Sequence, residues 1–249
     1  MPSQSYAIWF SQRVGSTLLS QALEDTGIAG RPREWFTDND NVGILAKHGV
    51  ATPSELRELL WREATSTNGV IGVKYGMVAA QHEQLTALFR ELLPTGRADA
   101  DDRHAWEAIF PRCQHVFMTR RNKVRLAVSW WRAIKSGEWH RASGAPAPTL
   151  DVVDKYDYDA IDYLRLEVDT RESLIHDLLA RWSVAVHTIV YEDLVAHYDA
   201  TIRGVLDFLQ IPDRENARIP APAFAQLADD LSDAWCERYE RERIARAQR

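Results

Sequence analysis

Cysteine is scarce in this sequence: the 249 residues include only two, Cys113 and Cys236. Two cysteines so far apart cannot build a disulfide framework, and their spacing is not that of a metal-binding pair. Scarce cysteine is typical of proteins that work in a reducing compartment. We therefore expect a cytoplasmic protein that needs no structural metal.

Long hydrophobic runs are also absent. No apolar stretch approaches the roughly 20 residues that a membrane-spanning helix needs, and no basic residue precedes the first short apolar run. We therefore expect neither a transmembrane segment nor a signal peptide. With 45% hydrophobic and 27% charged residues and no internal repeat, the composition is typical of a globular chain. Its length predicts a single domain, residues 1–249, with a helical C-terminal extension.

Positive charge is not in excess either, because the formal net charge is −6 at pH 7. A surface that binds a nucleic acid polymer needs surplus Lys and Arg, so we expect no nucleic acid partner. A site for a small anion must then be built from a local cluster of basic residues.

Four short apolar runs predict β-strands, at residues 6–10, 69–74, 115–119 and 188–191. Helix-like stretches follow them, beginning with residues 17–26. The alternation of strand and helix predicts an α/β fold with a mostly parallel central sheet flanked by helices. In such folds the ligand binds beyond the carboxyl ends of the strands, so the turns that follow them should hold the site.

Further helices are predicted from apolar residues spaced three and four apart. One stripe, within residues 122–135, comprises Val124, Ala127, Val128, Trp131 and Ile134, and we expect Trp131 to be buried. A second stripe comprises Leu194, Tyr198, Ile202, Val205 and Leu209. Residues 232–249 predict a charged helix that packs through Trp235 and Tyr239. Residues 30–41 and 137–149 lack a helical period and could cover a site, and we expect the second stretch to be mobile.

The first predicted turn has the composition of an anion site. Its sequence, SQRVGSTL at residues 11–18, joins a strand to a helix, whose N-terminal N–H groups favour negative charge. Gly15 allows close backbone approach, Ser16 and Thr17 offer hydroxyls, and Arg13 offers a guanidinium. The alternative is that Ser16 only caps the helix. A nucleotide-triphosphate loop would need Gly at Phe10 and Lys at Ser16, which disfavours a P-loop kinase.

A second basic segment lies beyond the third predicted strand. Residues 119–137 contain six basic residues and no acidic one: Arg120, Arg121, Lys123, Arg125, Arg132 and Lys135. Ser129 lies about two helical turns after the strand end, so a phosphate there could contact a guanidinium and a hydroxyl. The alternative is a solvated helix face that carries Lys and Arg.

These segments, together with GRPREWF, GVIGVKYGM and VYEDL, occur in one order along the chain. In that order they resemble the sulfotransferase superfamily, and most closely the bacterial trehalose 2-sulfotransferase-type family. The resemblance implies a P-loop-like three-layer fold, a homodimer, and the donor 3'-phosphoadenosine 5'-phosphosulfate (PAPS, which leaves PAP as product). The implied acceptor is a hydroxyl of a carbohydrate or glycolipid.

The resemblance also implies the roles of individual residues. The phosphosulfate would be bound by Arg13, Val14, Gly15, Ser16, Thr17 and Leu18. The 3'-phosphate would be bound by Ser129 with Arg120 or Arg121, since the register of the closest family selects Arg120 and the superfamily spacing selects Arg121. Glu34 would be the catalytic base, assisted by Arg13 and by Lys74. Trp35, Phe36 and Trp139, with Glu34, would contact the acceptor.

One departure and two alternatives complete these expectations. Residues 225–229 lack the arginine that the family pattern places there, which leaves the role of Gln226 and Leu227 open. A P-loop-type nucleotide kinase and a non-catalytic nucleotide-binding module remain the alternatives. His140 is a candidate for acceptor binding, but we expect a lone loop histidine to be solvated and assign it no catalytic role.

Overall fold

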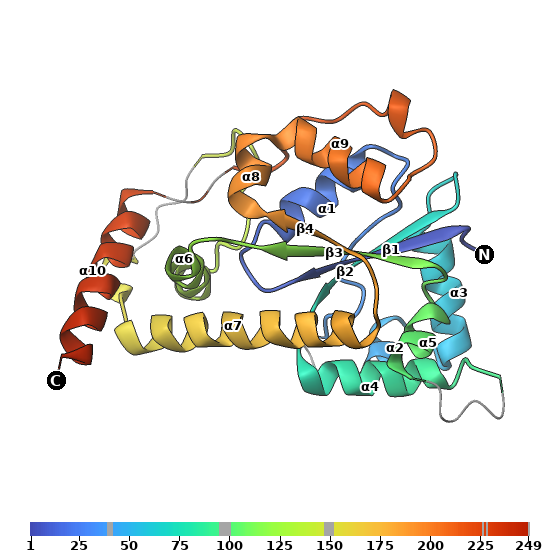
Figure 1. The fold of residues 1–249 in the computed structure, drawn as a ribbon, viewed down its shortest axis with the longest axis horizontal. Coiled ribbons are helices and arrows are strands. Elements are labelled where there is room, and N and C mark those ends of the chain that lie inside the picture. The colour runs from blue at the N-terminus through green and yellow to red at the C-terminus, as the bar shows by residue number, and fades with distance from the viewer. Residues whose placement is uncertain (39–41, 95–100, 147–151, 226, 228, 249) are drawn as a thin grey trace.

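A computed structural model of the chain contains one four-stranded sheet in which every strand pair is parallel (Figure 1). The structure describes residues 1–38, 42–94, 101–146, 152–225, 227 and 229–248. The strand order is β2-β1-β3-β4, with β1 at Gln4–Phe10, β2 at Val70–Gly76, β3 at Cys113–Thr119 and β4 at Val186–Val190. These strands confirm the four predicted runs, and the parallel sheet confirms the predicted α/β fold.

The alternating side chains of β1 belong to two separate hydrophobic clusters. Tyr6 and Ile8 belong to a cluster shared with α1 (Ser16–Asp25) and α9 (Tyr198–Phe208). Ala7 and Trp9 belong to a second cluster shared with α3 (Pro53–Ala64), α4 (Ala79–Arg90) and α5 (Asp102–Glu107). Successive side chains of a strand point to opposite faces, so both faces of the sheet are covered. Figure 1 shows α1 and α9 on one side of the sheet and α4 on the other.

Two helices lie beyond the carboxyl ends of the central strands, α6 at Lys123–Ser136 and α10 at Asp230–Ala247 (Figure 1). The long helix α7, Tyr158–Arg181, crosses one face of the sheet and contributes to both clusters. The remaining short elements are α2 at Ile44–Lys47, α8 at Tyr191–Ala196, and 3-10 turns at Val153–Lys155 and Arg214–Asn216. The predicted C-terminal helix is confirmed, with Trp235 and Tyr239 buried.

The predicted buried stripe of α6 is confirmed at Ala127 and Val128, which are fully buried, but not at Trp131 and Ile134. Trp131 is only partly buried and Ile134 is 46% exposed, whereas Leu126, Trp130 and Ala133 are buried. The helix packs between α7 and α10 rather than flat on the sheet. The indole of Trp131 donates to the carbonyl of Lys155 at the surface (2.8 Å), which satisfies its N–H without burial.

The second predicted stripe forms two helices rather than one. Helix α8 ends at Ala196 and α9 begins at Tyr198, because His197 between them has a non-helical backbone (φ −133°, ψ 48°). Of the two stretches expected to cover the site, residues 39–41 and 147–149 lie outside the described residues. The mobility of residues 137–149 stays a prediction.

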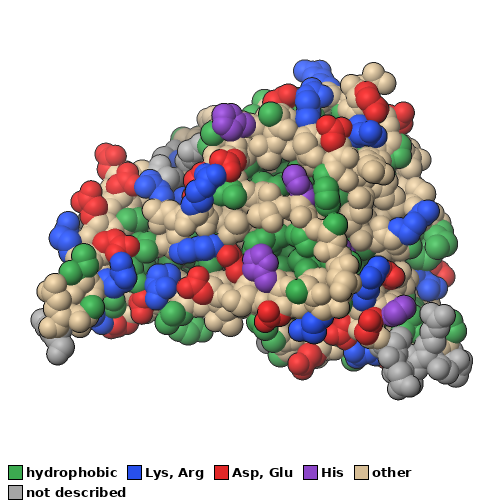
Figure 2. Space-filling model, in the orientation of Figure 1, with side chains coloured by type: hydrophobic (Ala, Val, Ile, Leu, Met, Phe, Trp, Pro, Cys, Tyr) green, Lys and Arg blue, Asp and Glu red, His purple; other side chains and the backbone are tan. Residues whose placement is uncertain are grey.

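Acidic and basic side chains are interspersed over the face of the molecule shown in Figure 2. Much of this charge is paired; for example, Arg103 of α5 and Glu107 lie 2.9 Å apart, and so do Arg203 of α9 and Asp199. In the described part of the chain, no helix combines the length and the apolar character that crossing a membrane requires.

Candidate active site

The turn between β1 and α1 presents the N-terminus of a helix to a cavity. Gly15 is the residue that precedes the helix, in a left-handed conformation (φ 79°), and no side chain caps the first turn. Ser16 is therefore the first helical residue and not the cap, and it is buried at the cavity wall. The N–H groups of this turn remain available to an anion, which the helix dipole also favours.

Gly15 is required by space as well as by backbone conformation. A Cβ atom at this position would lie 2.6 Å from Cδ2 of Tyr191, the first residue of α8. Only glycine allows the turn to approach this ring so closely. The close contact links the first turn to the strand end of β4, two segments that are far apart in the sequence.

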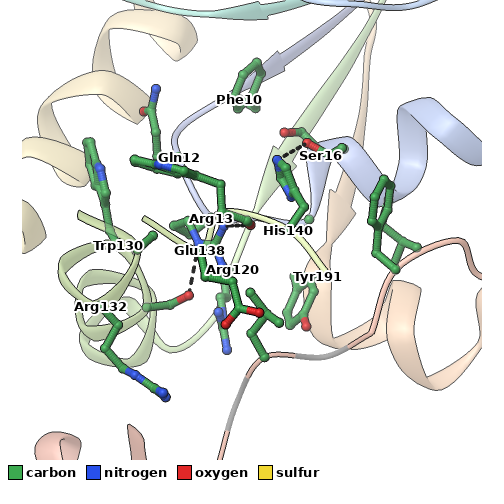
Figure 3. Close-up of a pocket in the computed structure, with 18 of the residues that line it drawn as sticks. Phe10, Gln12, Arg13, Ser16, Arg120, Trp130, Arg132, Glu138, His140 and Tyr191 are labelled. Carbon is green, nitrogen blue, oxygen red and sulfur yellow. Dashed lines mark hydrogen bonds between the residues drawn. The ribbon is translucent and has the colours of Figure 1, made fainter. Parts of the chain in front are cut away.

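Arg13 lies at the centre of the cavity and joins three segments (Figure 3). Its Nε donates to Oγ of Ser129 on α6 (3.1 Å), and its Nη1 donates to the carbonyl of Trp139. Burial, and next the positive charge of Arg120, lower the pKa of Arg13 to about 10. The side chain stays charged at pH 7, and an anion placed between the two guanidiniums would relieve their repulsion.

Lys74, at the end of β2, connects the first turn to Glu34. Its Nζ donates to Oγ1 of Thr17 (2.8 Å) and lies 2.8 Å from Oε1 of Glu34. The other oxygen of Glu34 accepts a hydrogen bond from the Thr37 hydroxyl (2.9 Å). Burial lowers the pKa of Lys74, while Glu34 opposes this shift. Thr17, Lys74 and Glu34 thus form one hydrogen-bonded row at the carboxyl ends of β1 and β2.

The two arginines that follow β3 lie in different environments. Arg120 is 7% exposed and lines the cavity with its guanidinium 4.5 Å from the ring centroid of Tyr191. Its Nε lies 3.5 Å from Oε1 of Glu192 and has no hydrogen-bond partner among the described residues. Arg121 points away from the cavity, where its exposed side chain pairs with Asp193. The structure therefore brings Arg120, and not Arg121, together with Ser129 and Arg13.

Other basic side chains of the cavity are already neutralised by acids. Arg125 of α6 lies 2.5 Å from the carboxylate of Asp233 in α10, and Arg132 lies 2.5 Å from that of Asp229, the residue that caps α10. Arg171 of α7 pairs with Glu167 (2.7 Å) and donates to the side chain of Gln12 (2.7 Å). The cations of the cavity without such a close carboxylate partner among the described residues are Arg13 and Arg120.

The cavity has a volume of about 680 Å³ and lies where the carboxyl ends of the strands meet α6 and α10. Its wall includes nine residues predicted from the sequence: Arg13, Gly15, Ser16, Thr17, Leu18, Glu34, Arg120, Ser129 and Trp139. Lys74 lies directly behind Thr17 and Glu34.

Besides Lys74 and Arg121, three more predicted residues do not line the cavity. Val14 is fully buried in the core, and Phe36 is buried among Phe89, Trp106 and Phe110. Trp35 donates its indole N–H to the carbonyl of Arg31, outside the cavity wall. Gln226 lies outside the described residues, whereas Leu227 contributes to the wall.

The sequence interpretation missed several residues of the cavity, including Gln12, Tyr191, Phe224, Arg171 and Ser232. Tyr191 is the last residue of a predicted strand, and this position at a strand end is the signal that could have found it. Arg171 and Ser232 carry no local signal, because they reach the cavity through the packing of α7 and α10. No group of three or more potential metal ligands is found among the described residues.

The comparisons with known proteins agree on one family. The model of the Stf0 sulphotransferase family matches residues 5–242. A trehalose 2-sulfotransferase of Mycobacterium tuberculosis is 28% identical over 95% of this chain and 94% of its own length. A trehalose 2-sulfotransferase of Mycolicibacterium smegmatis is 26% identical over 96% of this chain and 95% of its own length.

A solved structure shares the fold. The sulfotransferase from Alicyclobacillus acidocaldarius superposes with a TM-score of 0.53 at 11% identity, over 97% of this chain and 93% of that one. The family match spans both the first turn and the segment that holds Arg120 and Ser129. The chain therefore belongs to the Stf0 sulphotransferase family and is a sulfotransferase-family enzyme.

Proposed function

We propose that the protein transfers a sulfuryl group from PAPS to a hydroxyl of a carbohydrate or glycolipid, with Glu34 as the general base. The observation that carries the proposal is that one cavity contains two sets of groups suited to bind an anion. One is the uncapped N-terminus of α1 with Arg13, and the other is the buried guanidinium of Arg120 beside Ser129. A donor with one anionic group at the 5' position and another at the 3' position suits this pair.

The residues of the first turn would hold the phosphosulfate. The N–H groups of α1 and the side chain of Arg13 would bind its oxygens, and Arg120 with Ser129 would bind the 3'-phosphate. The donor supplies an activated sulfuryl group, because the bond between its sulfur and the phosphate oxygen breaks readily. Because Gly15 allows close approach, the backbone can contact the donor directly.

Glu34 and Lys74 would act in the transfer step, Glu34 as the base and Lys74 as a positive charge. In this structure Lys74 holds Oε1 of Glu34. When the phosphosulfate of the donor binds beside Thr17, we expect the ammonium group of Lys74 to turn toward it and to release Oε1 of Glu34. Glu34 then takes the proton of the acceptor hydroxyl as the acceptor oxygen bonds to sulfur and the bond from sulfur to the phosphate oxygen breaks. Arg13 and Lys74 stabilise the negative charge that grows on the leaving phosphate.

The acceptor side of the proposal rests on the relatives and on two aromatic residues. The curated relatives are named for trehalose, a carbohydrate. Trp130 and Trp139 line the cavity, and indole rings supply flat apolar surface together with a polar N–H. We therefore propose Trp139 as the acceptor contact among the aromatic residues predicted from the sequence.

Calorimetric titration with PAP, with 5'-AMP and with ATP-Mg tests the donor. We expect binding that requires the 3'-phosphate. A preference for ATP-Mg would instead favour a kinase. Incubation with PAPS and a panel of sugars and glycolipids then tests transfer, and binding of PAP without turnover on the whole panel would favour a non-catalytic module.

A further inference from the structure

Two backbone hydrogen bonds attach the segment that follows α6 to the chain before α10, beside the cavity. The backbone N–H of Ala225 donates to the carbonyl of Arg141 (2.9 Å), and that of Ser143 donates to the carbonyl of Ala223 (2.9 Å). On its cavity side, the carbonyl of Trp139 accepts a hydrogen bond from Arg13. Residues 138–143 are therefore tied both to the chain before α10 and to the first turn.

His140 is the side chain that this segment places against the first turn (Figure 3). Its ring packs against Phe224, with the ring centroids 5.5 Å apart, and its Nε2 lies 3.4 Å from Oγ1 of Thr17. As expected, His140 is exposed, but its exposed ring lines the cavity.

Thr17 is also the residue that Lys74 contacts, and Lys74 in turn contacts Glu34. The space between the N-terminus of α1 and Glu34 is the space in which a group moving from a donor phosphate to an acceptor oxygen must lie. Lys74 borders this space on the side of β2, and His140 borders it from the opposite segment. The imidazole can thus contact the transferred group, which the residues that bind the phosphates do not contact.

The charges around His140 determine which form of the imidazole is present. The groups that face it are Arg13, Lys74 and Glu34. Partial desolvation, followed by the two positive charges, lowers the pKa of His140, and Glu34 opposes this shift. Without a donor the neutral imidazole is therefore favoured, and its ring N–H can donate one hydrogen bond.

We propose that His140 contacts the sulfuryl group of the donor by donating a hydrogen bond to one of its oxygens. This inference rests on the proposed function, since it requires a phosphosulfate in the cavity. It assigns His140 to the group that is transferred, whereas the first turn and Arg120 would contact the phosphates that remain in the product.

PAPS and PAP differ only in the sulfuryl group, so their dissociation constants isolate this contact. Both are measured by calorimetry without acceptor at pH 7.5 for the wild type, for His140→Ala and for His140→Gln. We expect His140→Ala to weaken PAPS binding roughly tenfold, the loss of one hydrogen bond to a charged group, and to leave PAP binding unchanged. Gln keeps an N–H donor of similar reach, so His140→Gln should recover part of the PAPS affinity.

His187 provides the matched control. It is also an imidazole whose pKa is lowered by burial, but it lies on β4, stacked on Phe208 and outside the cavity wall. His187→Gln should change neither dissociation constant. Equal weakening of PAPS and PAP in His140→Ala, or no weakening of either, would overturn the inference while leaving the proposed donor intact. A wild type that binds neither nucleotide would overturn the proposed function and this inference together.

Discussion

Nε of Arg13 donates a hydrogen bond to Oγ of Ser129 across 3.1 Å, although 116 positions separate the two residues in the chain. This contact joins two motifs that the sequence indicates as separate anion sites. The first turn and α6 therefore form one continuous wall, and a ligand that spans them meets groups already oriented toward each other. Such preorganisation lowers the entropic cost of binding.

Ser129→Ala tests this connection. Removing the hydroxyl should free Arg13 from α6 and remove one donor to the 3'-phosphate, so we expect PAP to bind about five- to tenfold more weakly. The affinity for 5'-AMP, which lacks the 3'-phosphate, should change less. Calorimetry with both nucleotides measures the difference, and an equal loss for both would contradict the assignment of Ser129.

Arg120→Ala and Arg121→Ala form a matched pair that differs by one position. Arg120 is buried at the cavity wall, and its Nε has no hydrogen-bond partner among the described residues, whereas Arg121 is exposed and pairs with Asp193. We expect Arg120→Ala to weaken PAP binding by roughly 10- to 100-fold, the effect of losing a charge-assisted hydrogen bond, and Arg121→Ala to bind like the wild type. Calorimetric titration of both variants with PAP shows which arginine binds the 3'-phosphate. A larger effect at Arg121 would reverse our placement of the 3'-phosphate.

Glu34→Gln should separate binding from turnover. The amide keeps the shape of the carboxylate but cannot take the acceptor proton, so we expect turnover to fall by about 10²- to 10⁴-fold while PAP affinity stays within a few-fold of the wild type. Glu24, which pairs with Arg33 outside the cavity wall, provides the control as Glu24→Gln. The measurement is sulfuryl transfer from PAPS, and wild-type turnover in Glu34→Gln would remove Glu34 as the base.

Gly15→Ala should impair both stability and donor binding. A left-handed conformation costs an alanine about 1 to 2 kcal/mol, and the new methyl group would also push the Tyr191 ring away from Arg120. Gly137→Ala is the control, since Gly137 is also left-handed (φ 73°) but has open space around it. Urea unfolding should show a loss in both variants, whereas only Gly15→Ala should lose PAP affinity.

Stability should decrease when the pH falls below 6.5. Burial lowers the pKa of both His82 and His115 to about 4, so the unfolded chain binds protons at these positions before the folded chain does. The free energy of unfolding should be constant above pH 6.5 and fall between pH 6.5 and pH 4, by up to about 3 kcal/mol for each histidine. Urea unfolding at several pH values measures this dependence.

His82→Phe should flatten that dependence. Neither ring nitrogen of His82 has a hydrogen-bond partner among the described residues, and its neighbours Trp9, Tyr75 and Trp106 are aromatic. Phenylalanine therefore suits the position and does not titrate. A slope in His82→Phe equal to that of the wild type would show that His82 does not carry the effect.

The sequence allowed prediction of the strands and of the site residues that follow them, because both depend on local pattern. Each strand is a short apolar run, and Arg13, Lys74 and Arg120 all lie at or just beyond the end of one. Chain position alone could not separate Arg120 from Arg121, since the direction of a side chain after a strand depends on what packs beside it. Here the ring of Tyr191 attracts Arg120, and Asp193 pairs with Arg121.

Helix α7 shows the opposite case. Its buried residues follow a helical spacing through Ile161, Leu164 and Val168, so its existence could have been predicted from the sequence. Its contribution to the cavity could not, because Arg171 reaches Gln12 only after α7 has packed across the sheet. For the same reason the burial of Phe36 could not be predicted from its position directly after Glu34 and Trp35. It depends on the aromatic cluster that packs around the ring.

The all-parallel sheet also has a consequence for synthesis of the protein on the ribosome. Among the described residues no two strands form a hairpin, and β1 must wait for β2 and β3, which are translated much later, before it can pair. The wall of the cavity includes both Arg13 of the first turn and Ser232 of α10, which is translated much later. A nascent chain therefore carries an incomplete cavity until α10 has been translated and has packed against α6.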